Sequence, residues 1–240
     1  MYKGTIEYLH IMSGMSNREF KTELFEQFAR VSQALSSGKR LEILELLAQG
    51  ERSVDALTQL TGMTAANTSQ HLQQLRKAGL VASRKDGLFV IYRIAGGGVV
   101  RLLMALREVA ENNLAEVERL IKSFLSKKDN LEPVSADELR KLTRRGSVTV
   151  VDVRPPEEYA AGHLPGAINL PLPQLAKQLH KLPANREIVA YCRGPYCLLS
   201  FDAVEMLRSK GRKARRLAEG YPEWQSAGLP VEHTAPESSR

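Results

Sequence analysis

The segment from Ser53 to Ile94 restricts the fold of this chain more than any other part, because its helix breaks and its periodicity come in a fixed order. Ser53 and Thr64 are good helix N-caps, and Gly62 ends the first of the two capped runs. An Asp86-Gly87 pair then separates two strand-like runs, which indicates a hairpin. The sequence therefore predicts a helix over 54–60, a turn at Gly62, a second helix over 64–77, and a hairpin with strands over 80–84 and 88–94.

Three further runs with helical spacing surround this segment, over 18–35, 38–48 and 99–126. A helix pair followed by a glycine-tipped hairpin is the layout of a winged helix-turn-helix, whose second helix enters the major groove of DNA. We therefore expect a mainly helical DNA-binding and dimerisation domain over 18–125, preceded by an extension over 1–17.

The predicted second helix carries neutral side chains that can donate to and accept from base edges, and serines and threonines that can hold phosphates. Basic residues on the hairpin can meet the phosphate backbone. A Gln- and Thr-rich helix can also be only a solvated surface, and His71 by itself is as well explained by packing. The predicted DNA-binding residues are Thr64, Asn67, Thr68, Ser69, Gln70, His71, Gln74, Arg84, Lys85 and Arg93.

Residues 18–110 resemble the ArsR/SmtB family of bacterial repressors, through the runs 37–47, 69–72 and 75–81 and through Gly87 with Tyr92-Arg93-Ile94. The resemblance implies a homodimer, paired through the helices 18–35 and 99–126, that binds a pseudo-palindromic operator in double-stranded DNA. Many members of that family sense metals. This chain has no cysteine before Cys192 and no histidine in 99–126, so we expect no metal site and no cofactor.

The periodicity changes after the polar segment 126–133, which we interpret as a linker. A helix near 135–143 precedes a strand at 147–152, and a strand at 187–191 precedes a helix near 199–210. This alternation predicts an α/β domain over 134–233 with a largely parallel sheet, followed by a short tail over 234–240.

Cys192 directly follows the predicted strand 187–191, in a loop that opens a helix. Backbone N–H groups and a helix N-terminus lower the pKa of a thiol held in such a loop and stabilise an anionic persulfide. We predict that Cys192 is reactive and that Arg193 attracts an anionic sulfur donor. The alternative is an inert buried thiol. The predicted substrate loop comprises Arg193, Gly194, Pro195, Tyr196, Cys197 and Leu198.

Residues 132–233 resemble the rhodanese (sulfurtransferase) family, through the runs 150–154, 162–169, 219–224 and 227–231 and the Cys192 loop. The resemblance implies that Cys192 becomes persulfidated and that Asp152 and Arg154 form buried polar support near the loop. Active members commonly have Arg five residues after the cysteine, where Cys197 stands here, so thiosulfate turnover should be weak. Phosphatases on this fold need Arg where Leu198 stands, which argues against phosphate chemistry.

Cys197 has two interpretations that the sequence does not separate. It either resolves a persulfide on Cys192, forming a disulfide or a longer sulfur bridge, or it packs the helix start as a small apolar residue. Two cysteines are too few for a disulfide scaffold.

The chain has a formal net charge of +7, no apolar run that could span a bilayer and no signal-peptide pattern, so we expect a cytoplasmic protein without a membrane partner. We expect a DNA-binding transcriptional regulator that acts as a repressor and senses persulfide, polysulfide, thiosulfate or thiol oxidants through Cys192 and Cys197. An alternative is a sulfurtransferase enzyme whose DNA-binding domain is secondary. A third reading is a catalytically silent second domain that binds a partner.

Overall fold

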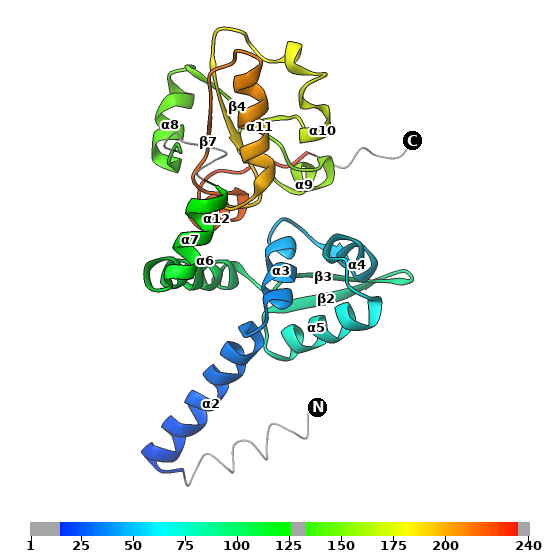
Figure 1. The fold of residues 1–240 in the computed structure, drawn as a ribbon. Coiled ribbons are helices and arrows are strands. Elements are labelled where there is room, and N and C mark those ends of the chain that lie inside the picture. Colours follow the sequence, from blue (N-terminus) through cyan, green and yellow to red (C-terminus); the bar gives the residue numbers. More distant parts are fainter. Residues whose placement is uncertain (1–14, 126–132, 235–240) are drawn as a thin grey trace.

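The computed structural model describes residues 15–125 and 133–234 (Figure 1). Most of the predicted extension 1–17, linker 126–133 and tail 234–240 lies outside the described residues. The described part forms two bodies with separate hydrophobic cores. The N-terminal body is helical with a small antiparallel sheet, and the C-terminal body is α/β, as the sequence predicts. No helix in the described ranges is both long and apolar enough to cross a membrane.

Four helices begin the N-terminal body, and their bounds agree with the sequence prediction to within about one residue. Ser53 accepts a hydrogen bond from the N–H of Ala56 at 3.1 Å, and Thr64 accepts one from Asn67 at 3.2 Å, so both predicted caps are confirmed. Gly62 ends the first of these helices with a φ of 65°. The helices are α2 (Asn17–Leu35), α3 (Gly38–Leu47), α4 (Val54–Thr61) and α5 (Ala65–Lys77).

The predicted hairpin is present, but its turn is one residue further along than expected. Asp86 pairs with Phe89, so the two-residue loop is Gly87-Leu88 rather than Asp86-Gly87. Gly87 supplies the positive φ, 58°, that a two-residue turn with glycine first requires. A third, very short strand was not predicted. The sheet order is β1 (Arg52–Ser53), β3 (Phe89–Ile94), β2 (Val81–Asp86).

The predicted single helix over 99–126 is wrong, because the chain forms α6 (Gly97–Asn113) and α7 (Ala115–Phe124) with a break between them. Leu114 has an extended backbone there, with φ −112° and ψ 104°. The break follows two consecutive asparagines, which are weak helix formers. The Asn113 side chain also donates to the Val109 carbonyl at 2.8 Å, so it competes for the backbone groups that would continue the helix.

The C-terminal body has a four-stranded sheet that is parallel throughout, in the order β5-β4-β6-β7. Alternate residues of the inner strand β6 (Glu187–Tyr191) face opposite layers. Ile188 packs toward α10 (Leu172–Leu175) and α11 (Leu198–Ser209), and Val189 packs toward α8 (Ala136–Arg144) and α12 (Tyr221–Ser226). Its elements are α8 (Ala136–Arg144), β4 (Val148–Asp152), α9 (Pro156–Ala161), β5 (Ile168–Asn169), α10 (Leu172–Leu175), η1 (Leu179–Lys181), β6 (Glu187–Tyr191), α11 (Leu198–Ser209), β7 (Ala214–Arg216) and α12 (Tyr221–Ser226).

Candidate functional site

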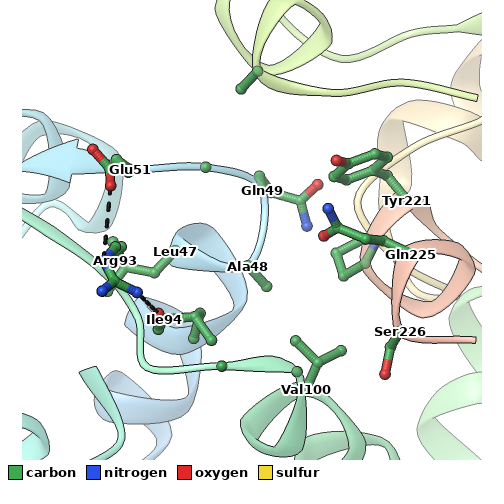
Figure 2. A pocket seen from close by; sticks show the side chains of 15 residues that line it. Leu47, Ala48, Gln49, Glu51, Arg93, Ile94, Val100, Tyr221, Gln225 and Ser226 are labelled. Atoms are coloured by element: carbon green, nitrogen blue, oxygen red, sulfur yellow. Dashed lines mark hydrogen bonds and ion pairs between the residues drawn. The ribbon is translucent and has the colours of Figure 1, made fainter. Parts of the chain in front are cut away.

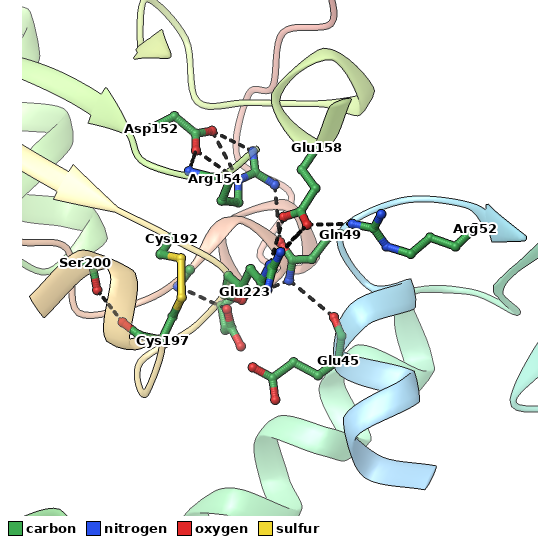
Figure 3. The surroundings of a disulfide bond; sticks show 12 residues. Glu45, Gln49, Arg52, Asp152, Arg154, Glu158, Cys192, Cys197, Ser200 and Glu223 are labelled. Carbon is green, nitrogen blue, oxygen red and sulfur yellow. Dashed lines mark hydrogen bonds and ion pairs between the residues drawn. A yellow bond between two sulfur atoms is a disulfide. The ribbon is translucent and has the colours of Figure 1, made fainter. Parts of the chain in front are cut away.

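Cys192 and Cys197 lie at the two ends of the loop between β6 and α11, and their sulfurs form a disulfide (Figure 3). Their Cα atoms are 6.1 Å apart. Cys192 is only 1% exposed, whereas Cys197 is half-buried at the N-cap of α11. The disulfide therefore closes a six-residue ring against the start of a helix.

The loop backbone keeps hydrogen-bond donors free. The N–H of Cys197 donates to the Gly194 carbonyl at 3.2 Å. The N–H groups of Arg193, Gly194 and Tyr196 have no acceptor among the described residues. Pro195 has no N–H to contribute. Free N–H groups beside a helix N-terminus form the kind of concave donor set that stabilises an anion.

The turn before α12 and the first residue of α12 contact the backbone of the cysteine loop. The N–H of Tyr221 donates to the Cys192 carbonyl at 3.1 Å. A side chain at Gly220 would overlap the backbone nitrogen of Gly194, so only glycine allows the two segments to approach this closely. The loop is therefore in direct backbone contact with the turn before α12.

Asp152 and Arg154 form a fully buried ion pair one strand away from the loop. Both side chains are 0% exposed, and Arg154 Nη2 lies 2.7 Å from Asp152 Oδ2. Arg154 also donates to the Gly162 carbonyl at 2.7 Å. The Tyr191 hydroxyl donates to Asp152 at 2.5 Å. Burial, reinforced by the Asp152 charge, raises the pKa of Tyr191, so this phenol stays a neutral donor.

The predicted role of Arg193 as an attractor of anionic donors does not fit its position in the structure. Its guanidinium binds Glu158, with Nη2 at 2.7 Å from Oε1 and Nε at 3.1 Å from both oxygens. Glu158 is buried and also receives Arg52 Nη2 at 2.5 Å. The Arg193 guanidinium is thus engaged by a carboxylate that it shares with Arg52, and it is not free to bind a donor anion.

The helical body supplies contacts to the cysteine loop that the sequence analysis missed. Gln49, which follows α3, donates from Nε2 to the Arg193 carbonyl at 3.0 Å and accepts from Arg154 Nη1 at 3.2 Å (Figure 3). Arg107 of α6 pairs with Glu223 of α12 at 2.6 Å. These partners are more than 100 residues apart in the chain, and no local pattern signals them.

A cavity of about 470 Å³ lies beside these contacts, between the two bodies (Figure 2). One wall comes from the end of α3, the end of β3 and the start of α6, and includes Gln49 and Val100. The other comes from α12 and includes Tyr221, Gln225 and Ser226. The two bodies therefore meet at a junction of ion pairs and hydrogen bonds that borders an open space.

The predicted DNA-reading helix, α5, presents most but not all of its predicted residues to solvent. Thr64, Asn67, Gln70 and Gln74 are exposed, and Ser69 and His71 are half-buried. Thr68 is 0% exposed, and its hydroxyl donates to the Thr64 carbonyl at 3.0 Å. The prediction that Thr68 contacts DNA is therefore wrong, because helical spacing turns this side chain toward the core with Leu72 and Leu75.

The hairpin places its basic residues near an acidic neighbour. Arg84 binds Glu51 at 2.9 Å and Asp86 at 2.8 Å, and Arg93 lies 4.0 Å from Glu51. Lys85 is exposed. Exposed Arg76 and Lys77, at the end of α5, add positive charge that the prediction did not include. Across 15–125 and 133–234, no three His, Cys, Asp or Glu side chains gather as a metal site requires.

Comparison with known proteins matches both bodies to families. Residues 37–83 match the model of the bacterial regulatory protein arsR family, and residues 135–227 match the rhodanese-like domain. A sulfurtransferase of Allochromatium vinosum is 32% identical over 99 residues, 41% of this chain and 89% of that protein.

A solved structure, the homodimeric winged helix-turn-helix DNA-binding domain (fragment 1–100) of Mb0332 from Mycobacterium bovis, is 48% identical. It covers 43% of this chain and 94% of that one, with a TM-score of 0.39. The HTH-type transcriptional regulator Rv0324 of Mycobacterium tuberculosis is 47% identical over 225 residues, which is 94% of this chain and 98% of that protein. The chain therefore belongs to the ArsR-type helix-turn-helix transcriptional regulators, as a member with a C-terminal rhodanese-like domain.

Proposed function

We propose that this regulator senses reactive sulfur through Cys192 and Cys197 and changes its affinity for operator DNA in response. The observation that carries the proposal is the position of the disulfide loop. Its backbone is bound by the helical body at Gln49, so a change in the loop meets the DNA-binding half directly.

The proposed chemistry balances without a cofactor. The Cys192 thiolate attacks the sulfane sulfur of a hydropersulfide or polysulfide, and the donor S–S bond breaks. A hydropersulfide leaves as a thiolate, and a polysulfide leaves as an anion one sulfur shorter. The Cys197 thiolate then attacks the Cys192 sulfur, and hydrosulfide leaves as the disulfide forms. Two thiols are oxidised by two electrons while the sulfane sulfur is reduced to sulfide. The free N–H groups of Arg193, Gly194 and Tyr196 are suited to hold the anionic persulfide.

The proposed DNA contact uses α5 in the major groove and Lys85 on the hairpin against phosphate. The proposed assembly is a homodimer. Large apolar side chains on α2, α6 and α7 are exposed in the single chain, which is the pattern of a surface covered by a partner. They include Phe20 at 50%, Phe25 at 58%, Phe28 at 55%, Val109 at 60% and Leu120 at 68% exposed.

The test measures DNA affinity in defined states of the loop. A DNA fragment selected by the dithiol form from a random pool is titrated with the dithiol form, the disulfide form and the polysulfide-treated protein. We expect the dissociation constant to change by about fivefold or more between the dithiol and disulfide forms, and Cys192→Ser to abolish the response. An unchanged constant, with the loop state verified by intact mass spectrometry, would contradict the proposal.

The sulfurtransferase alternative makes a different prediction about Cys197. Cys197 occupies the position where an anion-binding arginine is expected. The two nearby cations, Arg193 and Arg107, are paired with Glu158 and Glu223, so neither is free to hold thiosulfate. We expect weak thiosulfate turnover in the native protein and faster turnover in Cys197→Arg. Robust Cys192-dependent turnover by the native protein would favour the enzyme instead.

A further inference from the structure

Gln49 is a buried amide with both of its ends occupied by the other body. It is 1% exposed. Its Nε2 donates to the Arg193 carbonyl at 3.0 Å, and its Oε1 accepts from Arg154 Nη1 at 3.2 Å. A glutamine side chain can serve as donor and acceptor at once, which neither an ionised Glu nor a Met can do. The residue thus connects the cysteine loop to the Asp152–Arg154 pair.

The carbonyl that Gln49 holds belongs to the ring closed by Cys192 and Cys197. Peptide units are planar, so fixing the Arg193 carbonyl also fixes the direction of the Gly194 N–H, one of the free donors of the loop. The far end of Gln49 is held rigidly, because Arg154 is tied to Asp152 and to the Gly162 carbonyl. A change in the ring that moves the Arg193 carbonyl would therefore disturb its hydrogen bond with Gln49.

Other contacts hold the same loop from the helical side. Glu158 joins the Arg193 side chain to Arg52, and the Arg107 guanidinium lies beside Gly194. Burial and the nearby Glu111 carboxylate of α6 raise the pKa of Tyr196. Three of the four residues between the two cysteines thus lie against side chains of the helical body.

The segment that carries Gln49 leads directly into the DNA-binding elements. Arg52 and Ser53 form β1, which pairs with β3 of the hairpin. Ser53 also caps α4, the first helix of the helix-turn-helix. A displacement at Gln49 would act on the hairpin and on α4 within four residues, through bonded and hydrogen-bonded contacts.

We propose that Gln49 of the DNA-binding body is a positioning residue for the cysteine loop. It couples the dithiol or disulfide state of the Cys192–Cys197 pair to DNA affinity. The coupling rests on the proposed function, but the positioning role does not require DNA. The contact is present with the disulfide closed, so its loss should favour the dithiol form.

The first measurement is the dithiol–disulfide equilibrium of the full-length protein in dithiothreitol redox buffers without DNA, read by trapping free thiols and intact mass spectrometry. Gln49→Met removes both cross-body contacts, together with a longer hydrogen bond from Nε2 to the Glu45 carbonyl at 3.4 Å within the helical body. Gln49→Glu keeps an acceptor for Arg154 but loses the donor to Arg193. We expect both variants to favour the dithiol form by about threefold to tenfold, the size of one buried hydrogen bond. Gln225→Met, on the opposite wall of the same cavity, removes an exposed amide that makes no hydrogen bond within the described ranges, so it should match the wild type.

The second measurement is the ratio of DNA dissociation constants between the two loop states. By linkage, DNA must shift the redox equilibrium by the same factor. We expect Gln49→Met to bring the ratio within about twofold of one and Gln225→Met to keep the wild-type ratio. A folded Gln49→Met protein with wild-type redox equilibrium and ratio would overturn the inference. A wild-type ratio of one would instead overturn the proposed function, while the equilibrium without DNA still decides the role of Gln49.

Discussion

Replacing Arg154 by methionine removes the cation from the most buried ion pair of the C-terminal body. Arg154 and Asp152 are both 0% exposed, and the guanidinium donates to both carboxylate oxygens, from Nε at 3.1 Å and from Nη2 at 2.7 Å. After Arg154→Met the carboxylate would retain the Tyr191 hydroxyl and one backbone N–H, without a compensating charge.

The expected cost follows from this burial. Breaking a buried pair by removing one partner destabilises a protein by about 3–5 kcal/mol, because a charge is left in a poorly solvated site. For a body of about 100 residues, that lowers the melting temperature by at least about 12 °C. Adding Asp152→Asn removes the stranded charge, so the double variant should recover at least about half of the loss.

The assay is urea unfolding followed by tryptophan fluorescence. The chain has a single tryptophan, Trp224, which is buried in the core of the C-terminal body, so this signal follows the unfolding of that core. The control is Arg215→Met, which removes the cation from ion pairs with Glu187 at 2.7 Å and with Glu138 at 3.0 Å. The side chains of these pairs are 25% to 42% exposed, so each pair should contribute no more than about 1 kcal/mol.

Two outcomes would refute the reasoning. If Arg154→Met and Arg215→Met cost the same free energy of unfolding, burial would not be the source of the effect. If the double variant with Asp152→Asn were less stable than Arg154→Met alone, the loss would come from packing rather than from an uncompensated charge.

Three further predictions concern other sites. Burial raises the pKa of Glu45 in the folded protein, so the protein loses stability as the pH rises above 4.5 and this buried carboxyl ionises. Glu45→Gln should therefore raise the melting temperature at pH 7.5 and leave it unchanged at pH 4. Thr68→Val should leave DNA affinity within about twofold of wild type, whereas Asn67→Ala should weaken it by about fivefold or more in a fluorescence titration. Gly220→Ala should displace the loop at Gly194, destabilise the C-terminal body by about 1–3 kcal/mol in urea unfolding and change the rate of Cys192 persulfidation.

Each of these has a contradicting result. Equal melting temperatures for Glu45→Gln and wild type at pH 7.5 would mean that the carboxylate carries no burial cost. A large affinity loss in Thr68→Val would place that side chain at the DNA. Unchanged stability and reactivity in Gly220→Ala would show that the loop yields freely to an added methyl group.

The elements that local chemistry specifies were predicted well. The caps at Ser53 and Thr64, the stop at Gly62 and the apolar run of β6 each depend on residues within a few positions of one another. The errors lie where local signals were balanced. The helix break at Leu114 interrupts an unbroken apolar periodicity, and the hairpin turn moved by one residue because Gly87 can occupy the first turn position as well as the second.

By itself, the sequence determined the two families, the order of the elements and the place of Cys192 after a strand and before a helix, because each depends on short-range pattern. Only the tertiary structure decided that Arg193 is bound by Glu158 and that Gln49 reaches the cysteine loop. These contacts join residues 35 to 144 positions apart. The Gln49 contact exists because the two bodies pack against each other, and the Arg193–Glu158 pair exists because the fold of the C-terminal body brings the cysteine loop beside α9. Neither contact has a local signal in the chain.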